Sequence, residues 1–135
     1  MKKYQFRLDF QVRDYECDLQ GVVNNAVYQN YLEHTRHEFI KQLGLDFAEL
    51  TRRGINLVVI RAELDYKRSL RSGDSFWVGL ILERISPLRF AFRQDVYLQP
   101  DDKLVLKAWI TGTGVNAKGR PELPLEISSV LDAAL

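Results

Sequence analysis

Alternation of apolar and polar residues predicts that much of the chain is β-strand. In the range 6–13 every second residue is apolar and the residues between are polar or charged, which is typical of a half-buried strand. Similar alternation predicts strands over 56–67, 75–85, 89–98 and 103–115, with a last short strand near 120–123. In the first of these later strands, the face expected to point inward carries Val58, Ile60, Ala62, Leu64 and Tyr66.

A different spacing predicts a long helix over residues 25–43. Its apolar face has members three and four residues apart, which is the helical period; they are Tyr28, Tyr31, Leu32, Thr35, Phe39, Ile40 and Leu43. Asn24 precedes this range as an expected N-cap, and Gly44 follows it as an expected stop. We also expect a short helix over 46–53 and a terminal helix over 125–135.

The order of these elements predicts an α+β fold. One long helix covers one face of a five- or six-stranded antiparallel sheet. The other face of that sheet carries Trp77, Ile81, Trp109 and Val115 among charged residues. A half-apolar face and at least one unpaired edge strand favour association with a second copy. We therefore expect a homodimer or a homotetramer.

Composition excludes several classes of function. The 135 residues fit a single domain, 1–135, and 19 basic residues against 18 acidic ones give no electrostatic case for nucleic-acid binding. The longest apolar run, 57–60, is too short to span a membrane. Cys17 is the only cysteine, so no internal disulfide forms. The basic N-terminal segment lacks the apolar stretch of a signal peptide, and we expect a cytoplasmic protein.

The segment 12–28 carries the chemistry. It consists of a strand end, a loop with three carboxylates (Asp14, Glu16 and Asp18), a glycine and a helix start. Free amides at a helix N-terminus suit a developing oxyanion, and a nearby carboxylate acts as nucleophile or general base. Thioester hydrolysis needs little more. The spacing alone does not choose among the three carboxylates.

The same segment resembles the signature of the 4-hydroxybenzoyl-CoA thioesterase family of hotdog proteins. The aspartate before Leu19-Gln20-Gly21, the valine pair and the helix entry carry this likeness. With 33–39 and the turn 70–74, the chain is similar in particular to the plant acyl-lipid thioesterases, also called methylketone-synthase thioesterases, and their bacterial relatives. The likeness runs from residue 4 to about residue 127. Since no transit peptide is evident, we expect a bacterial relative.

The resemblance implies a hotdog fold and hydrolysis of acyl-CoA or acyl-carrier-protein thioesters in fatty acid metabolism, without a cofactor. Carried over by position, Asp18 is the catalytic carboxylate and the amide that polarises the carbonyl is that of Asn25. Several bacterial relatives have histidine or tyrosine at this position, so no side-chain role is carried over for Asn25. We expect substrate contacts from Gly21, Val22, Tyr28 and Arg89, the last of these with CoA phosphates.

Two other functions stay open. A hotdog dehydratase needs a histidine beside an acid, and none lies within 14–28. A non-catalytic module that binds acyl thioesters would retain the fold without turnover. His34 and His37 lack a third metal ligand, so we expect no metal site. Glu33 is a minor alternative to Asp18, in a site shared between subunits. Acyl chain length, the carrier and the choice between nucleophile and base also stay open.

Overall fold

The computed structural model describes residues 4–133. Its strands and helices follow the predicted order, apart from the last short strand near 120–123. They are β1 (Phe6–Gln11), a 3-10 turn η1 (Asp14–Glu16), α1 (Asn25–Gln42), α2 (Phe47–Arg52), β2 (Asn56–Tyr66), β3 (Ser75–Ser86), β4 (Arg89–Leu98), β5 (Lys103–Val115) and α3 (Leu125–Ala133). The last two residues of the expected terminal helix and the first three of the basic N-terminus lie outside the described residues.

The strands form one antiparallel sheet of five, in the order β1-β3-β4-β5-β2. The expected sixth strand over 120–123 is wrong for the described part of the chain. There, Pro121 makes only an isolated bridge to Val115. A proline has no amide hydrogen to donate to a ladder, and Pro124 follows three residues later, so the pairing stops after this single contact.

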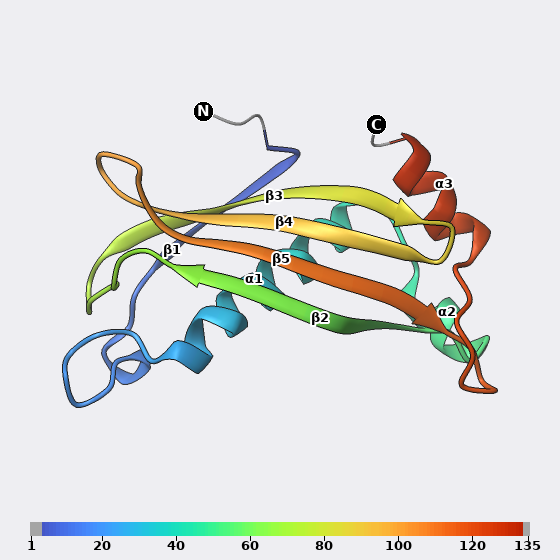
Figure 1. Cartoon of the computed structure of the whole chain (residues 1–135), viewed down its shortest axis with the longest axis horizontal. Helices are drawn as coiled ribbons and strands as arrows, with labels where there is room; N and C mark the ends of the chain where they lie inside the picture. The colour runs from blue at the N-terminus through green and yellow to red at the C-terminus, as the bar shows by residue number, and fades with distance from the viewer. Residues whose placement is uncertain (1–3, 134–135) are drawn as a thin grey trace.

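Helix α1 runs across one face of the sheet (Figure 1). The Asn24 side chain accepts a hydrogen bond from the amide of Ala26 at 2.9 Å, which confirms the predicted N-cap. Midway along the helix, Leu32 is fully buried and Gln94 of β4 donates to its carbonyl oxygen at 2.9 Å. Gln94 in turn accepts from Arg36 at 3.0 Å, so a buried polar contact ties the middle of the helix to the sheet.

The inward face of β2 differs from the prediction. The pairing of β2 with β5 shifts register between Val59 and Arg61, which leaves Ile60 as the residue of a β-bulge. A bulge reverses which side chains point inward on either side of it. Leu57 and Leu64, an odd number of residues apart, both pack against the core, whereas Val58 and Ile60 are exposed.

The outer face of the sheet is also less open than expected. Trp77 is only 2% exposed, because Tyr4 and Tyr97 pack around its ring at centroid distances of 5.6 and 4.6 Å. The guanidinium of Arg7 lies 4.2 Å from the same ring, a cation–π contact. Among residues 4–133, no helix combines the length and the hydropathy of a membrane span.

The cluster of Tyr4, Trp77 and Tyr97 on the outer face makes the stability of the fold sensitive to pH in the alkaline range. The Tyr4 hydroxyl donates to Asp95 at 2.5 Å and lies 2.7 Å from the Tyr97 hydroxyl. Burial, and then these hydrogen bonds, raise the pKa of Tyr4 above its ordinary value of 10.0. The folded protein keeps this proton where the unfolded chain loses it. The stabilisation is therefore complete below about pH 10 and is lost as the pH rises further.

We predict that the free energy of unfolding falls between pH 9 and pH 11, and that it falls less steeply in Tyr4→Phe, which has one tyrosine fewer to deprotonate on unfolding. Urea denaturation at intervals across that range measures both slopes. Identical slopes in the wild type and the variant would contradict the prediction.

Candidate active site

The loop between β1 and α1 folds as a small hairpin. Cys17 pairs with Val23 in an antiparallel bridge, and the amide of Asp18 donates to the carbonyl of Val22 at 2.9 Å. At its tip the amide of Gly21 donates back to the carbonyl of Asp18 at 3.0 Å, and Gly21 has φ +78°. Glycine adopts that left-handed conformation without steric cost. The glycine of the motif therefore serves the turn that follows Asp18.

One oxygen of the Asp18 carboxylate accepts a hydrogen bond from the amide of Gln20 at 2.9 Å. The side chain is exposed. Within residues 4–133, no hydrogen bond or ion pair engages its second oxygen. The internal bond orients the carboxylate.

A pocket of about 300 Å³ joins Asp18 to the start of α1. Its walls come from the loop, the first helical turn and the segment after β2: Asp18, Val22–Asn25, Tyr28 and Tyr66–Ser69. The cap and the first turn use the amides of Ala26 and Val27. No hydrogen bond in the described part of the chain uses the amide of Asn25. The pocket thus combines a carboxylate with an amide at a helix N-terminus, where the helix dipole favours negative charge.

Tyr28 forms the inner wall of this pocket. It is 3% exposed, and its hydroxyl accepts a hydrogen bond from the amide of Leu70 at 2.9 Å. Burial raises the pKa of this hydroxyl, so it stays protonated. Its ring contacts that of Tyr66 at a centroid distance of 5.5 Å, and the Tyr66 hydroxyl lies 3.5 Å from the carbonyl oxygen of Asn25. Tyr28 therefore links the helix start to the end of β2.

The structure separates the three carboxylates that spacing leaves equivalent. Asp14 accepts from the hydroxyl of Ser72. Glu16 accepts at 2.8 Å both from the amide of Arg13 and from the hydroxyl of Tyr31. These two carboxylates thus hold the loop against its neighbours. Of the three, Asp18 alone lines the pocket at the helix start.

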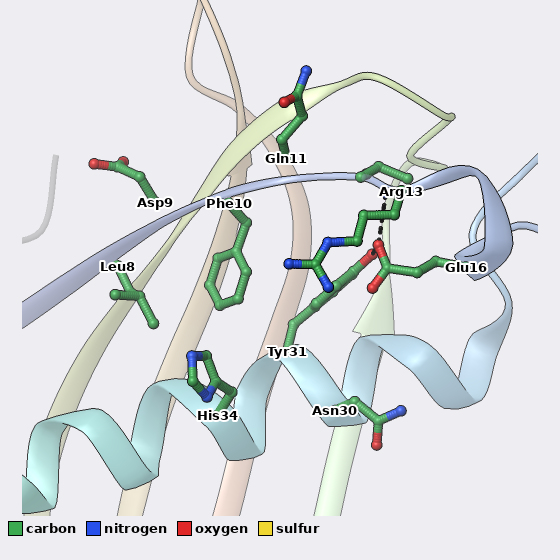
Figure 2. Close-up of a pocket in the computed structure, with 10 residues that line it drawn as sticks. Leu8, Asp9, Phe10, Gln11, Arg13, Glu16, Asn30, Tyr31 and His34 are labelled. Atoms are coloured by element: carbon green, nitrogen blue, oxygen red, sulfur yellow. Dashed lines mark hydrogen bonds between the residues drawn. The ribbon is translucent and has the colours of Figure 1, made fainter.

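Glu16 instead faces a larger cavity, about 620 Å³, between β1 and α1 (Figure 2). The ring of His34 lies in this cavity, against Phe10 at a centroid distance of 6.0 Å. His37 points to another face of the helix, 3.9 Å from Glu33 across one turn. The two histidines are therefore apart, and residues 4–133 contain no group of three potential ligands for a metal ion.

Sequence reasoning missed the basic residues Lys67 and Arg68, which line the Asp18 pocket. They follow β2, and the bridge between Val22 and Arg71 brings that segment beside the loop. Only this tertiary pairing identifies them. The predicted substrate contact Arg89 begins β4, at the end of the sheet beside α3, whereas the Asp18 loop lies at the opposite end (Figure 1).

Comparisons with known proteins agree with this architecture. The chain is 39% identical over 84% of its length to the chloroplast acyl-acyl carrier protein thioesterase ATL2 of Arabidopsis thaliana, and it spans 61% of that relative. It is 28% identical to the long-chain acyl-CoA thioesterase FadM of Escherichia coli, over 85% of this chain and 86% of that protein.

A crystal structure of a hypothetical protein from Aquifex aeolicus superposes on this chain with a TM-score of 0.84. The identity is 32%, and the superposition covers 93% of this chain and 98% of that one. The fold is accordingly the hotdog fold that the sequence predicts. The model of the thioesterase-like superfamily matches residues 12–135, and the chain belongs to that superfamily.

Proposed function

We propose that this protein hydrolyses acyl thioesters of CoA or of an acyl carrier protein, with Asp18 as the catalytic carboxylate. The observation that carries the proposal is that Asp18 and Asn25, whose amide has no hydrogen bond in the described part of the chain, line one pocket. The names of the plant and Escherichia coli relatives support the reaction class.

In the proposed mechanism, the thioester carbonyl oxygen accepts a hydrogen bond from the Asn25 amide. Asp18 either removes a proton from a water molecule that attacks the carbonyl carbon, or attacks that carbon itself to give an anhydride that water then hydrolyses. In both routes the C–S bond breaks and the thiolate leaves with its electron pair. One oxyanion donor of this kind contributes about 2.7–4 kcal/mol to transition-state stabilisation.

Basic residues of the pocket suit a thiol carrier that bears phosphates. Lys67 and Arg68 are exposed at its rim, where they suit the phosphates of CoA or of a phosphopantetheine arm. We propose an aliphatic acyl group, because the Escherichia coli relative is named a long-chain acyl-CoA thioesterase. The cytoplasmic location expected from the sequence stays a prediction.

We also propose a homodimer that forms through β2. This strand lies at the edge of the sheet and pairs only with β5. It exposes Val58, Val59 and Ile60 at 37, 51 and 46%. An edge strand of 11 residues, with one side free of a neighbouring strand in the described part of the chain and with exposed apolar side chains, favours addition of another strand; an identical copy supplies it about a twofold axis.

Such a dimer joins two pockets. Antiparallel pairing of two β2 strands sets the end of one strand, at Tyr66, beside the beginning of the other. That beginning lines a cavity of about 280 Å³ with apolar walls from β2, β4 and β5, and with Glu33 and His37 on its helical side. The Asp18 pocket of one copy thereby continues into an apolar cavity of the other, which suits an acyl chain.

The same pairing gives Arg89 a place in the site. Across the sheet, Arg89 pairs with Thr113 and Thr113 pairs with Val58. Arg89 therefore lies at the end of the sheet that approaches the partner's Asp18 loop in the proposed dimer, two strands from the edge. A contact between Arg89 and the phosphates of CoA is consistent with the dimer and not with a single chain.

We predict that Asp18→Asn lowers kcat for acyl-CoA hydrolysis by at least about 100-fold, because the amide neither accepts the proton of water nor attacks the carbonyl; such groups contribute about 10²–10⁴-fold. Free-thiol release over a panel of acyl-CoA and acyl-carrier-protein substrates measures the loss. The matched control is Asp101→Asn, an exposed residue in the turn between β4 and β5. Equal loss in both variants, or none in Asp18→Asn, would refute the assignment.

We predict that Ile60→Lys dissociates the dimer, because an ammonium buried without a partner costs several kcal/mol, which corresponds to at least about a 100-fold weaker dimer. Ile85→Lys is the control, since Ile85 has the same 46% exposure but lies at the far end of β3. Sedimentation equilibrium distinguishes the two. A dimer that persists in Ile60→Lys would exclude β2 as its interface.

A further inference from the structure

Glu16 is bonded on three sides although it is not part of the Asp18 pocket. Its carboxylate accepts at 2.8 Å from the amide of Arg13, two residues after the end of β1, and from the hydroxyl of Tyr31, in the second turn of α1. Its carbonyl accepts at 3.1 Å from the amide of Asn24, the helix cap. One residue therefore connects the strand, the cap and the body of the helix.

Tyr31 is a rigid anchor for this carboxylate. It is 5% exposed, and its ring packs between Phe10 and Phe76 at centroid distances of 5.4 and 4.8 Å. The hydroxyl is therefore held in place by the core. Burial, and then the hydrogen bond to Glu16, raise the pKa of Tyr31 above its ordinary value, so the hydroxyl remains a donor throughout the usable pH range.

Glu16 lies close in sequence to Asp18 and close in space to the residue before Asn25. Cys17 forms its bridge to Val23, and Asp18 follows two residues after Glu16 with its amide bonded to Val22. On the other arm of the hairpin, the carbonyl of Glu16 accepts a hydrogen bond from the amide of Asn24, the residue just before Asn25. The backbone carbonyl of Glu16 thus bonds the arm that leads to Asn25, and the Glu16 side chain anchors this backbone to Tyr31 just before Asp18.

We propose that Glu16 and Tyr31 form a positioning pair that fixes the Asp18 carboxylate relative to the Asn25 amide. The pair acts through the backbone and does not touch the substrate. It rests on the proposed role of Asp18. A misplacement of about 1 Å in a catalytic group costs on the order of 100-fold in rate, so a pair that holds two arms of one loop controls turnover more than substrate binding.

The geometry also distinguishes this role from that of a general base. The Glu16 carboxylate points into the cavity between β1 and α1 (Figure 2), and Glu16 does not line the Asp18 pocket. Its contacts require an acceptor oxygen and no negative charge. Glutamine keeps that oxygen, so it preserves a positioning contact, whereas it abolishes the action of a base.

The test compares Glu16→Ala, Glu16→Gln, Tyr31→Phe and the double variant Glu16→Ala/Tyr31→Phe. For each, kcat and KM are measured by free-thiol release from an acyl-CoA that the wild type hydrolyses, and thermal unfolding is recorded. Tyr15→Phe is the matched control, because it removes a hydroxyl from the same turn at a residue that is 75% exposed.

We expect Glu16→Ala and Tyr31→Phe to lower kcat roughly 10- to 100-fold with KM within about twofold. We expect Glu16→Gln and Tyr15→Phe to stay within about threefold of the wild type. The double variant loses no more than Glu16→Ala alone, because both changes break one contact. If Glu16→Ala does not fold, Tyr31→Phe, which keeps the ring in the core, decides the question alone.

Three results would overturn the pair. Glu16→Gln as inactive as Glu16→Ala would place the Glu16 charge in the chemistry. Wild-type kcat in Tyr31→Phe would remove its hydroxyl from the argument. A change in KM alone would indicate substrate binding. An inactive wild type on every CoA and carrier-protein substrate, by contrast, overturns the proposed function and the pair with it.

Discussion

Burial of one face of α1 against the sheet is the constraint on which the site depends. The helix is fixed along its axis at two points, by the bond from Gln94 to the carbonyl of Leu32 and by the bond between Tyr28 and the amide of Leu70. Its first turn therefore has a set position over the end of β2. The loop that ends at the Asn24 cap must bridge from β1 to that position, and this requirement shapes the hairpin that presents Asp18.

Elements that depend on local pattern were predictable, and those that depend on pairing partners were not. The strands and α1 follow from hydrophobic periodicity, and the Asn24 cap follows from side-chain chemistry at one residue. The bulge at Ile60 gave no signal, because the apolar run 57–60 is compatible with either inward face. The sixth strand, by contrast, could have been excluded from the sequence, because Pro121 disfavours extended pairing.

The site shows the same division. The segment and the proposed type of chemistry could be inferred from the carboxylates, the glycine and the helix start. The choice among the carboxylates was not, because the contacts that occupy Asp14 and Glu16 come from Ser72 and Tyr31, 58 and 15 residues away. Lys67 and Arg68 were missed for the same reason, and so was the cavity between β1 and α1. Family resemblance supplied the choice of Asp18 that local physics left open.

The two edges of the sheet are unequal, and this limits how the protein assembles. The edge at β2 has 11 residues and exposes Val58, Val59 and Ile60 near its beginning, beside an ion pair between Arg61 and Glu63 at 2.7 Å. The edge at β1 has only six residues, and its outward residues include an ion pair between Arg7 and Asp9 at 3.1 Å. In the proposed dimer, twofold pairing uses the β2 edge of both copies and leaves the six-residue β1 edges exposed. In that dimer only the short β1 edges remain for further pairing, which disfavours growth of a continuous sheet into fibrils.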